Sequence, residues 1–214
     1  MPRTFIAIPS IGTTDIRFAV SLAALRKPQG TAIASSPRSI PDIARNGLFD
    51  QALKFSYDSV FFLDDDMVLD ADLLTQLQCQ LGKSDPSVAA IAPLAFRRHP
   101  PFTPCAFIKN RSGDYKPISD LEAGVIEVDA IHFAATLVRS SWLEKVSPPR
   151  FEFQKEGQSY TGEDLVLCEK LKSLGAKLLL DTLIPEALHI GLPPLVGRKA
   201  FEMARQAESR LVVP

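Results

Sequence analysis

The sequence predicts an α/β fold with a mostly parallel central sheet and helices on both faces. Short apolar segments alternate with segments of helical periodicity over the first hundred residues, an order typical of parallel strands joined by crossover helices. Segment 59–63, Ser-Val-Phe-Phe-Leu, is apolar at consecutive positions, which indicates a strand covered on both faces. The chain of 214 residues is 46% hydrophobic and 23% charged, so it is long and apolar enough to bury a core without disulfides or metal.

The first half supplies four strands and three helices. Phe18, Leu22 and Leu25 fall on one face of the first helix, and Pro28 and Gly30 follow its end. The expected strands are 4–8, 31–34, 59–63 and 88–93, and the expected helices are 15–25, one that opens at 39–42, and 70–81.

The second expected helix opens with Ser39 and Asp42, a pattern close to the capping box of helix amino termini. Asp50 and Lys54 are four residues apart on this helix, so they can form an ion pair.

The second half is less regular. Prolines and basic side chains dominate segment 96–119, which predicts a long functional or mobile loop without helices or central strands. Gly175 stands at the usual carboxyl end of a helix that carries Leu167 and Leu171 on its apolar face. The expected strands are 125–129, 133–138 and 177–180, and the expected helices are 141–145, 163–174 and 199–211.

Charge and cysteine content exclude several classes of protein. Lys and Arg total 24 and Asp and Glu total 25, so no global charge attracts nucleic acid or an anionic membrane. Three widely spaced cysteines predict small, buried free thiols in a reducing compartment rather than a disulfide framework or a zinc site. The amino-terminal segment does not resemble a signal peptide, and no apolar run approaches about 18 residues. We therefore expect a cytoplasmic protein without a membrane span.

The acidic triplet Asp64-Asp65-Asp66 directly follows the expected third strand. The carboxyl end of a buried parallel strand opens to the crevice where α/β sheets bind ligands. Three adjacent carboxylates repel one another, and a hard divalent cation that bridges them to a diphosphate would relieve the repulsion. The structural alternative is a solvated acidic turn before the next helix.

Two further segments carry candidate functional residues. Thr161-Gly162-Glu163-Asp164 precedes a helical pattern, where Thr161 can cap the helix and the dipole favours acidic residues. A carboxylate fixed in that position also suits a general base. His189 lies between apolar residues, either as a core histidine or as the imidazole that completes a metal site built from oxygen atoms.

Together these segments resemble the family 2 glycosyltransferases of the GT-A fold over roughly residues 4–191. The matching segments, in chain order, are 6–10, 44–46, 60–67, 127–130, 137–139, 162–165 and 189–191. The resemblance implies a single GT-A, Rossmann-like domain over 1–195, with a nucleotide-binding half at about 1–95 and an acceptor half at about 96–195. A helical tail over 196–214 would follow it.

The resemblance also implies a role for each matching position. Asp164 corresponds to the catalytic base and Glu163 to its neighbour near the acceptor, while Asp66 and His189 correspond to metal ligands. An imidazole ligand among oxygen ligands favours Mn²⁺ over Mg²⁺. The positions that would hold the nucleotide sugar are Pro9, Ser10, Arg45, Asn46, Asp64, Asp65 and Asp129.

We therefore expect a metal-dependent, inverting glycosyltransferase that moves a sugar from a nucleotide-diphosphate donor to an acceptor hydroxyl. One alternative is a nucleotidyltransferase or another nucleotide-sugar phosphate enzyme, although segment 9–15 has one Gly and no Lys or Arg for a phosphate loop. The second alternative is a nucleotide-sugar or glycan-binding module without turnover. No nucleic-acid partner is expected, and the carboxyl-terminal helix is a candidate contact between copies in a homo-oligomer.

Overall fold

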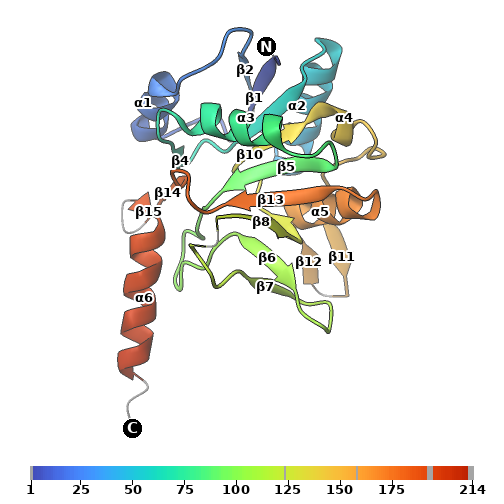
Figure 1. Ribbon diagram of the computed structural model, residues 1–214. Helices are drawn as coiled ribbons and strands as arrows, with labels where there is room; N and C mark the ends of the chain where they lie inside the picture. Colours follow the sequence, from blue (N-terminus) through green and yellow to red (C-terminus); the bar gives the residue numbers. More distant parts are fainter. Residues whose placement is uncertain (1, 123, 158, 192–194, 212–214) are drawn as a thin grey trace.

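Seven strands form the central sheet of the computed structural model, which describes residues 2–122, 124–157, 159–191 and 195–211 (Figure 1). Their order across the sheet is β2-β1-β3-β10-β5-β13-β8. The strands are β1 (Thr4–Ser10), β2 (Ala32–Pro37), β3 (Ser59–Leu63), β5 (Val88–Pro93), β8 (Val125–Val128), β10 (Ala135–Arg139) and β13 (Lys177–Asp181). Strands β3 and β5 have the bounds that the sequence predicted.

The sheet is mixed, not mostly parallel as predicted. β1 pairs in parallel with β2 and β3, and β13 pairs in parallel with β5. β10 lies antiparallel between β3 and β5, and β8 lies antiparallel at the edge beside β13. The antiparallel strands come from the second half of the chain, where the alternation of strand and crossover helix that favours parallel pairing has ended.

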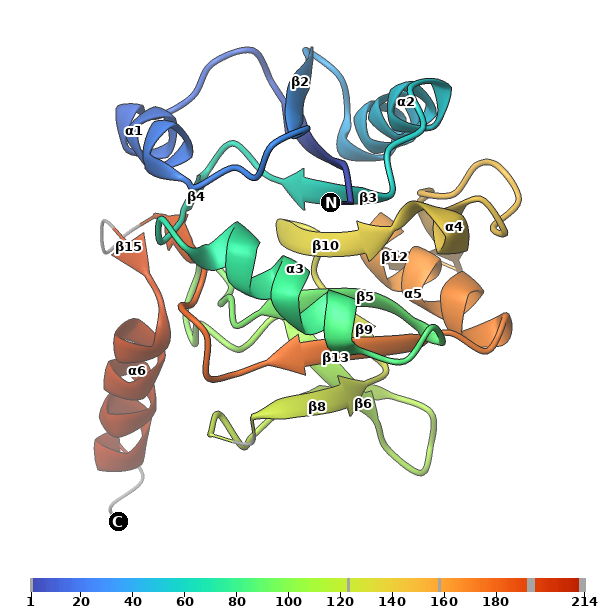
Figure 2. The same ribbon diagram turned by 45° about the horizontal axis from the view of Figure 1, so that its top comes forward.

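Six helices are described: α1 (Ile16–Ala24), α2 (Pro41–Lys54), α3 (Leu73–Lys83), α4 (Ser140–Leu143), α5 (Glu163–Ser173) and α6 (Arg198–Leu211). Side chains of α2, α4 and α5 pack on one face of the sheet, and those of α1 and α3 pack on the other. Figure 2 shows α3 in front of the sheet and α5 behind it. The α/β class with helices on both faces is therefore confirmed.

The core follows the alternation of side chains along the buried strands. On β1, Phe5 and Ala7 contribute to one apolar cluster, while Ile6 and Ile8 contribute to the other. The strands of the sheet centre are thus covered on both faces, as the unbroken apolar run 59–63 predicted.

Three small sheets lie outside the central one. β4 (Met67–Val68) pairs with β14 (Leu188–Ile190), which also pairs with β15 (Leu195–Val196). β6 (Ala106–Lys109) and β7 (Tyr115–Pro117) form a hairpin that joins β9 (Ala130–Ile131), and β11 (Gln154–Glu156) pairs with β12 (Ser159–Thr161). The predicted loop 96–119 therefore contains a hairpin, whose short and mostly exposed strands have too little apolar alternation to be detected from sequence.

Local turn chemistry shifts two helix starts. α2 begins at Pro41, a favoured first helical residue, and Ile40 before it gives no side-chain cap. α3 begins at Leu73 rather than Asp70, because the Asp70 carboxylate accepts the N–H of Asp72 in the preceding turn.

The carboxyl-terminal helix α6 extends away from the body of the molecule (Figure 1). Near its start, Phe201 packs on Phe96, with 5.6 Å between ring centroids. Residues 212–214 of the predicted tail lie outside the described residues. Among the described residues, no helix is long and apolar enough to cross a membrane. The three cysteines are free thiols, as predicted, but only Cys168 is buried and Cys79 is exposed, so the predicted burial of all three was wrong.

Asn46 joins α2 to the segment that follows α4. Its amide nitrogen donates to the carbonyls of Asp42 and Phe151, at 2.9 and 2.8 Å. Its amide oxygen accepts the N–H groups of Arg150 and Phe151, at 3.0 and 3.2 Å. Arg150 also pairs with Asp50 at 3.2 Å, whereas the predicted pair of Asp50 with Lys54 does not occur among the described residues.

We expect Asn46→Ala to lower the free energy of unfolding by about 1–3 kcal/mol, because partly buried backbone groups lose their partners. Urea denaturation followed by circular dichroism would measure this change. Gln51→Ala, at an exposed position of the same helix, should change the free energy of unfolding by less than about 0.5 kcal/mol. Equal denaturation midpoints for the two variants would contradict the role of Asn46 in holding this segment.

Candidate functional site

A buried guanidinium joins carboxylates from two distant segments of the chain. Arg45 on α2 has a side chain that is only 3% exposed. Its Nη2 lies 2.8 Å from Oδ1 of Asp64, just after β3. Its Nη1 forms an ion pair with Glu163 and lies 3.4 Å from Oδ1 of Asp164, in the first turn of α5. The acidic triplet and the Glu163-Asp164 pair are thereby held together.

Three carboxylates around one guanidinium leave an excess of negative charge. Burial raises the pKa of Asp64 to about 6, although Arg45 acts to lower it. Burial also raises the pKa of Glu163 and of Asp164, again against the influence of Arg45. Burial disfavours the charge on Arg45 itself, but its carboxylate neighbours raise its pKa, so the guanidinium stays protonated.

Asp164 is fixed in direction, and one of its oxygen atoms has an ion-pair neighbour but no hydrogen-bond donor among the described residues. Its Oδ2 accepts the N–H of Phe133 at 2.9 Å. Its Oδ1 is buried and accepts no hydrogen bond from the described residues. Helix α5 begins at Glu163 with Gly162 as its N-cap, so the prediction that Thr161 caps this helix was wrong. Gly162 has no side chain that could cap the helix or cover the carboxylates.

The acidic triplet lines a cavity of about 380 Å³, here called the aspartate cavity. Pro9 and Ser10, at the end of β1, line another part of it. Thr14 fixes the triplet by donating to the carbonyl of Asp65 at 2.6 Å. Oδ2 of Asp65 is buried and has no hydrogen-bond partner among the described residues. Asp65, a lining residue of the cavity, therefore carries a covered acceptor without a partner among the described residues.

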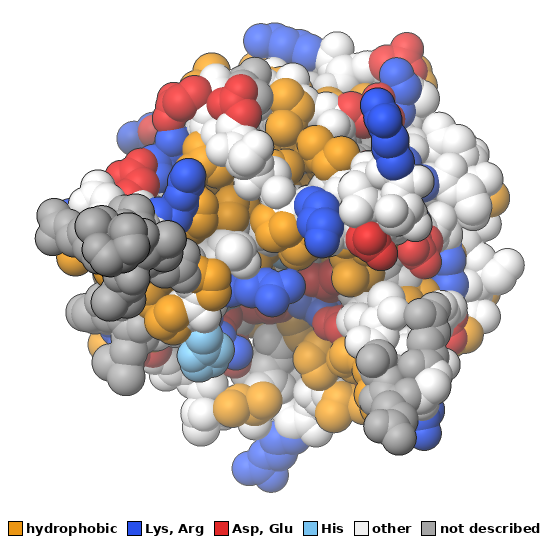
Figure 3. Space-filling model, turned by 90° about the horizontal axis from the view of Figure 1, so that it is seen from below, with side chains coloured by type: hydrophobic (Ala, Val, Ile, Leu, Met, Phe, Trp, Pro, Cys, Tyr) orange, Lys and Arg blue, Asp and Glu red, His pale blue; other side chains and the backbone are white. Residues whose placement is uncertain are grey.

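Arg98 lies between this cavity and a larger one. Its guanidinium is 2.8 Å from Oδ2 of Asp66, and its side chain lines both cavities. The second cavity, of about 660 Å³, is lined by residues of segments 97–107 and 115–117 together with His189, and is here called the loop cavity. Seen from below, the surface has a hollow with acidic side chains deep inside and basic side chains across it (Figure 3).

Strand pairing brings His189 beside the acidic triplet. In the pairing of β14 with β4, His189 stands opposite Met67, and the N–H of Ile190 donates to the carbonyl of Asp66 at 2.8 Å. The Nδ1 of His189 donates to the carbonyl of Phe96, which leaves Nε2 with a lone pair. Burial lowers the pKa of His189 against the charge of Asp66, which favours the neutral imidazole that binds metals.

Atoms of the kinds that bind a hard divalent cation lie around the triplet. Asp65 offers a buried oxygen without a partner, Asp66 already holds a cationic group, and His189 presents a free ring nitrogen nearby. Carboxylate oxygens suit Mg²⁺ and Mn²⁺, and the imidazole favours Mn²⁺. Within the part of the chain that the structure describes, no three His, Cys, Asp or Glu side chains form a preassembled metal group.

The predicted nucleotide-sugar residues divide into two groups. Pro9, Ser10, Asp64 and Asp65 line the aspartate cavity. Arg45, Asn46 and Asp129 line neither cavity: Arg45 binds the carboxylates and Asn46 holds the segment after α4. Asp129 pairs with Lys172 at 2.9 Å and accepts the N–H of Lys109 at 2.7 Å.

Sequence reasoning missed three groups of the site. Arg98 is one of the basic side chains of the proline-rich segment 96–119, and that segment was the only signal for it. The hydroxyl of Thr14 and the backbone N–H of Phe133 had no signal, because short polar side chains and backbone donors occur throughout any sequence.

Comparisons with known proteins inform the fold. No protein-family model matches the sequence, and no curated protein matches it. Among solved structures, the crystal structure of A197 from STIV is similar, with a TM-score of 0.59 and 19% sequence identity. The match covers 87% of this chain and 85% of that chain. At this identity the similarity concerns the fold alone.

We expect Arg45→Met to lower the free energy of unfolding by on the order of 3 kcal/mol near neutral pH, because three carboxylates lose their counter-charge. Without Arg45, the pKa values of these carboxyl groups in the folded variant lie still further above those in the unfolded chain. At about pH 8 the groups must be ionised without a counter-charge, whereas at about pH 5 they can bind protons. The loss of unfolding free energy should therefore be greater at about pH 8 than at about pH 5.

Urea denaturation at both pH values would measure these losses. Arg26→Met is the matched control, because Arg26 forms an exposed pair with Asp72 that is worth less than about 1 kcal/mol. A loss for Arg45→Met that is no larger than the control's, or that does not grow with pH, would contradict the assigned role of Arg45.

Proposed function

We propose that this chain is a metal-dependent, inverting glycosyltransferase with a GT-A fold. It would transfer a sugar from a nucleotide-diphosphate donor to an acceptor hydroxyl. The observation that carries the proposal is the ion-pair network of Arg45, which joins the acidic triplet after β3 to the Glu163-Asp164 pair of α5. The mixed α/β sheet and the position of His189 beside the triplet add support.

The aspartate cavity is the proposed donor site. Pro9 and Ser10 would hold the nucleotide, Asp64 would contact its ribose, and Asp65 would also bind the nucleotide sugar. A divalent ion, Mn²⁺ in preference to Mg²⁺, would bind Asp66 and His189 with the donor diphosphate. When bound, such an ion stabilises the negative charge that develops on the leaving diphosphate.

Asp164 is the proposed general base. Its Oδ1, which accepts no hydrogen bond from the described residues, would take the proton of the acceptor hydroxyl while the acceptor oxygen forms a bond to the anomeric carbon. The bond from that carbon to the diphosphate oxygen breaks, and its electron pair leaves with the diphosphate. Attack opposite the leaving group inverts the anomeric configuration. The raised pKa of Asp164 strengthens it as a base, and Arg45 acts as a positioning residue for the carboxylates.

Asp66→Ala should weaken Mn²⁺-dependent nucleotide binding by more than about tenfold, because a proposed metal ligand is lost. Isothermal titration with UDP, GDP, ADP and dTDP, with and without Mn²⁺, would measure it. Asp114→Ala, at an exposed turn, should leave binding unchanged. Equal affinity of Asp66→Ala and the parent protein in Mn²⁺ would contradict the metal role, and a parent that binds none of these nucleotides would contradict the proposed function.

Asp164→Asn should lower Mn²⁺-dependent hydrolysis of the donor, with water as the acceptor, by about 10²–10⁴-fold. Donor affinity should change little, because the base contacts the acceptor. Nucleotide release over time and a parallel binding titration would separate the two effects, with Asp114→Asn as the control. Simultaneous loss of binding and turnover would indicate a structural role, whereas a parent that binds donors without turnover would support the binding-module alternative.

A further inference from the structure

The loop cavity adjoins the proposed donor site and has its own chemical character. Arg97, Arg98 and His99 line it, and none of the described residues in its lining is acidic. The aspartate cavity next to it has the opposite character, with the acidic triplet in its wall. The two cavities share Arg98, so a ligand in the loop cavity would lie beside a ligand of the triplet.

Arg97 provides a cationic group that is not already neutralised. Arg98 pairs with Asp66, but Arg97 forms no ion pair within the described residues. Its guanidinium carbon lies 5.9 Å from the ring centroid of Phe107, a contact that leaves its N–H groups open to a ligand. A planar guanidinium matches the oxygen atoms of phosphate and carboxylate groups, so the lining favours an anion.

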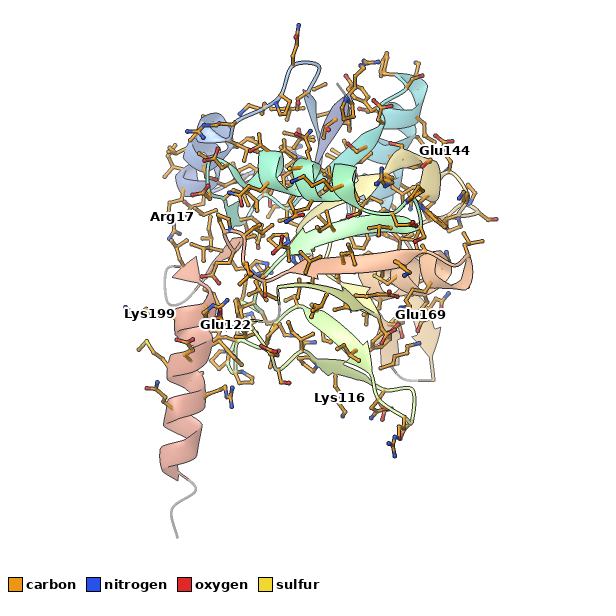
Figure 4. All side chains as sticks on the ribbon, in the orientation of Figure 1. Arg17, Lys116, Glu122, Glu144, Glu169 and Lys199 are labelled. Carbon is orange, nitrogen blue, oxygen red and sulfur yellow. The ribbon has the colours of Figure 1, made fainter. Side chains whose placement is uncertain are left out.

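Two aromatic rings form a wall of the same cavity. Phe107 and Tyr115 line it, with their centroids 6.3 Å apart in an edge-to-face arrangement. The hydroxyl of Tyr115 donates to Glu169 at 3.0 Å, and Lys109 pairs with the same carboxylate. Figure 4 labels Glu169 on α5. The wall is therefore held in place by α5 and can face a sugar or aromatic ring.

Cys105 connects the loop cavity to the segment that holds the proposed base. It lines the cavity, and its carbonyl accepts the N–H of His132 at 3.0 Å. The next residue, Phe133, donates its N–H to Asp164 at 2.9 Å. A ligand in the loop cavity would therefore lie between Arg98, which binds Asp66, and the segment that holds Asp164.

We propose that the loop cavity binds an anionic group carried on a ring, such as a sugar phosphate or a sugar carboxylate, and that Arg97 recognises the anion while Phe107 and Tyr115 face the ring. If the proposed glycosyl transfer is correct, the ligand of the loop cavity is the acceptor, and the acceptor is an anion that carries a ring.

Titration with glucose 6-phosphate, glucose and inorganic phosphate, monitored by protein NMR, tests the proposal without a metal. Glucose 6-phosphate should bind most tightly. Arg97→Met should weaken its binding by at least about tenfold, whereas Arg111→Met, an exposed arginine in the turn of the same hairpin, should not. Tyr115→Leu should weaken binding of glucose 6-phosphate but not of inorganic phosphate.

Failure of all three probes to bind, or equal affinities for Arg97→Met and Arg111→Met, would overturn the proposal. A second titration in saturating UDP or GDP with Mn²⁺ separates the two sources of anion. If glucose 6-phosphate still binds, the result supports the acceptor site. If the nucleotide displaces glucose 6-phosphate, the cationic groups belong to the site of the donor diphosphate and the proposal is overturned. If no nucleotide binds but the probe still depends on Arg97, the glycosyltransferase proposal fails while the anion site stands.

Discussion

The rest of the site depends on the charge of one buried side chain, Arg45. Without it, the carboxylates of Asp64, Glu163 and Asp164 would face one another in a partly buried space, where like charges strongly disfavour ionisation. With it, the carboxyl end of β3 and the amino end of α5 can meet at the same place and still keep ionised groups there. The guanidinium lies on α2, so the packing of that helix on the sheet also sets the geometry of the carboxylates.

The same arrangement explains why Arg45 is not at a ligand-binding surface. Its planar group has carboxylate neighbours from two directions, and its side chain is almost fully covered. The adjacent Asn46 is likewise occupied, by backbone groups at the segment after α4. Two residues that resemble a nucleotide-binding pair in sequence thus stabilise the protein around the site, and the cavity lining comes from the ends of β1 and β3.

The sequence predicted those features that local pattern determines. The unbroken apolar run 59–63 and the triplet after it were placed correctly, because a buried strand and its polar end leave a clear signal. The direction of β10 was not predictable, since its neighbours β3 and β5 are far away in sequence. Arg98 and the Phe133 N–H were missed for the same reason: each acts on a carboxylate brought near by the fold.

Arg98 also constrains how the two cavities can fill. Its guanidinium binds the same carboxylate, Asp66, that is the proposed ligand of a divalent ion. A divalent ion at Asp66 and the guanidinium of Arg98 would repel each other, because both are cations close to one carboxylate. Both can bind there only if further negative charge is present. A donor diphosphate supplies that charge. The arrangement therefore favours joint binding of ion and diphosphate over binding of the ion alone, and it leaves Arg98 between the diphosphate and whatever occupies the loop cavity.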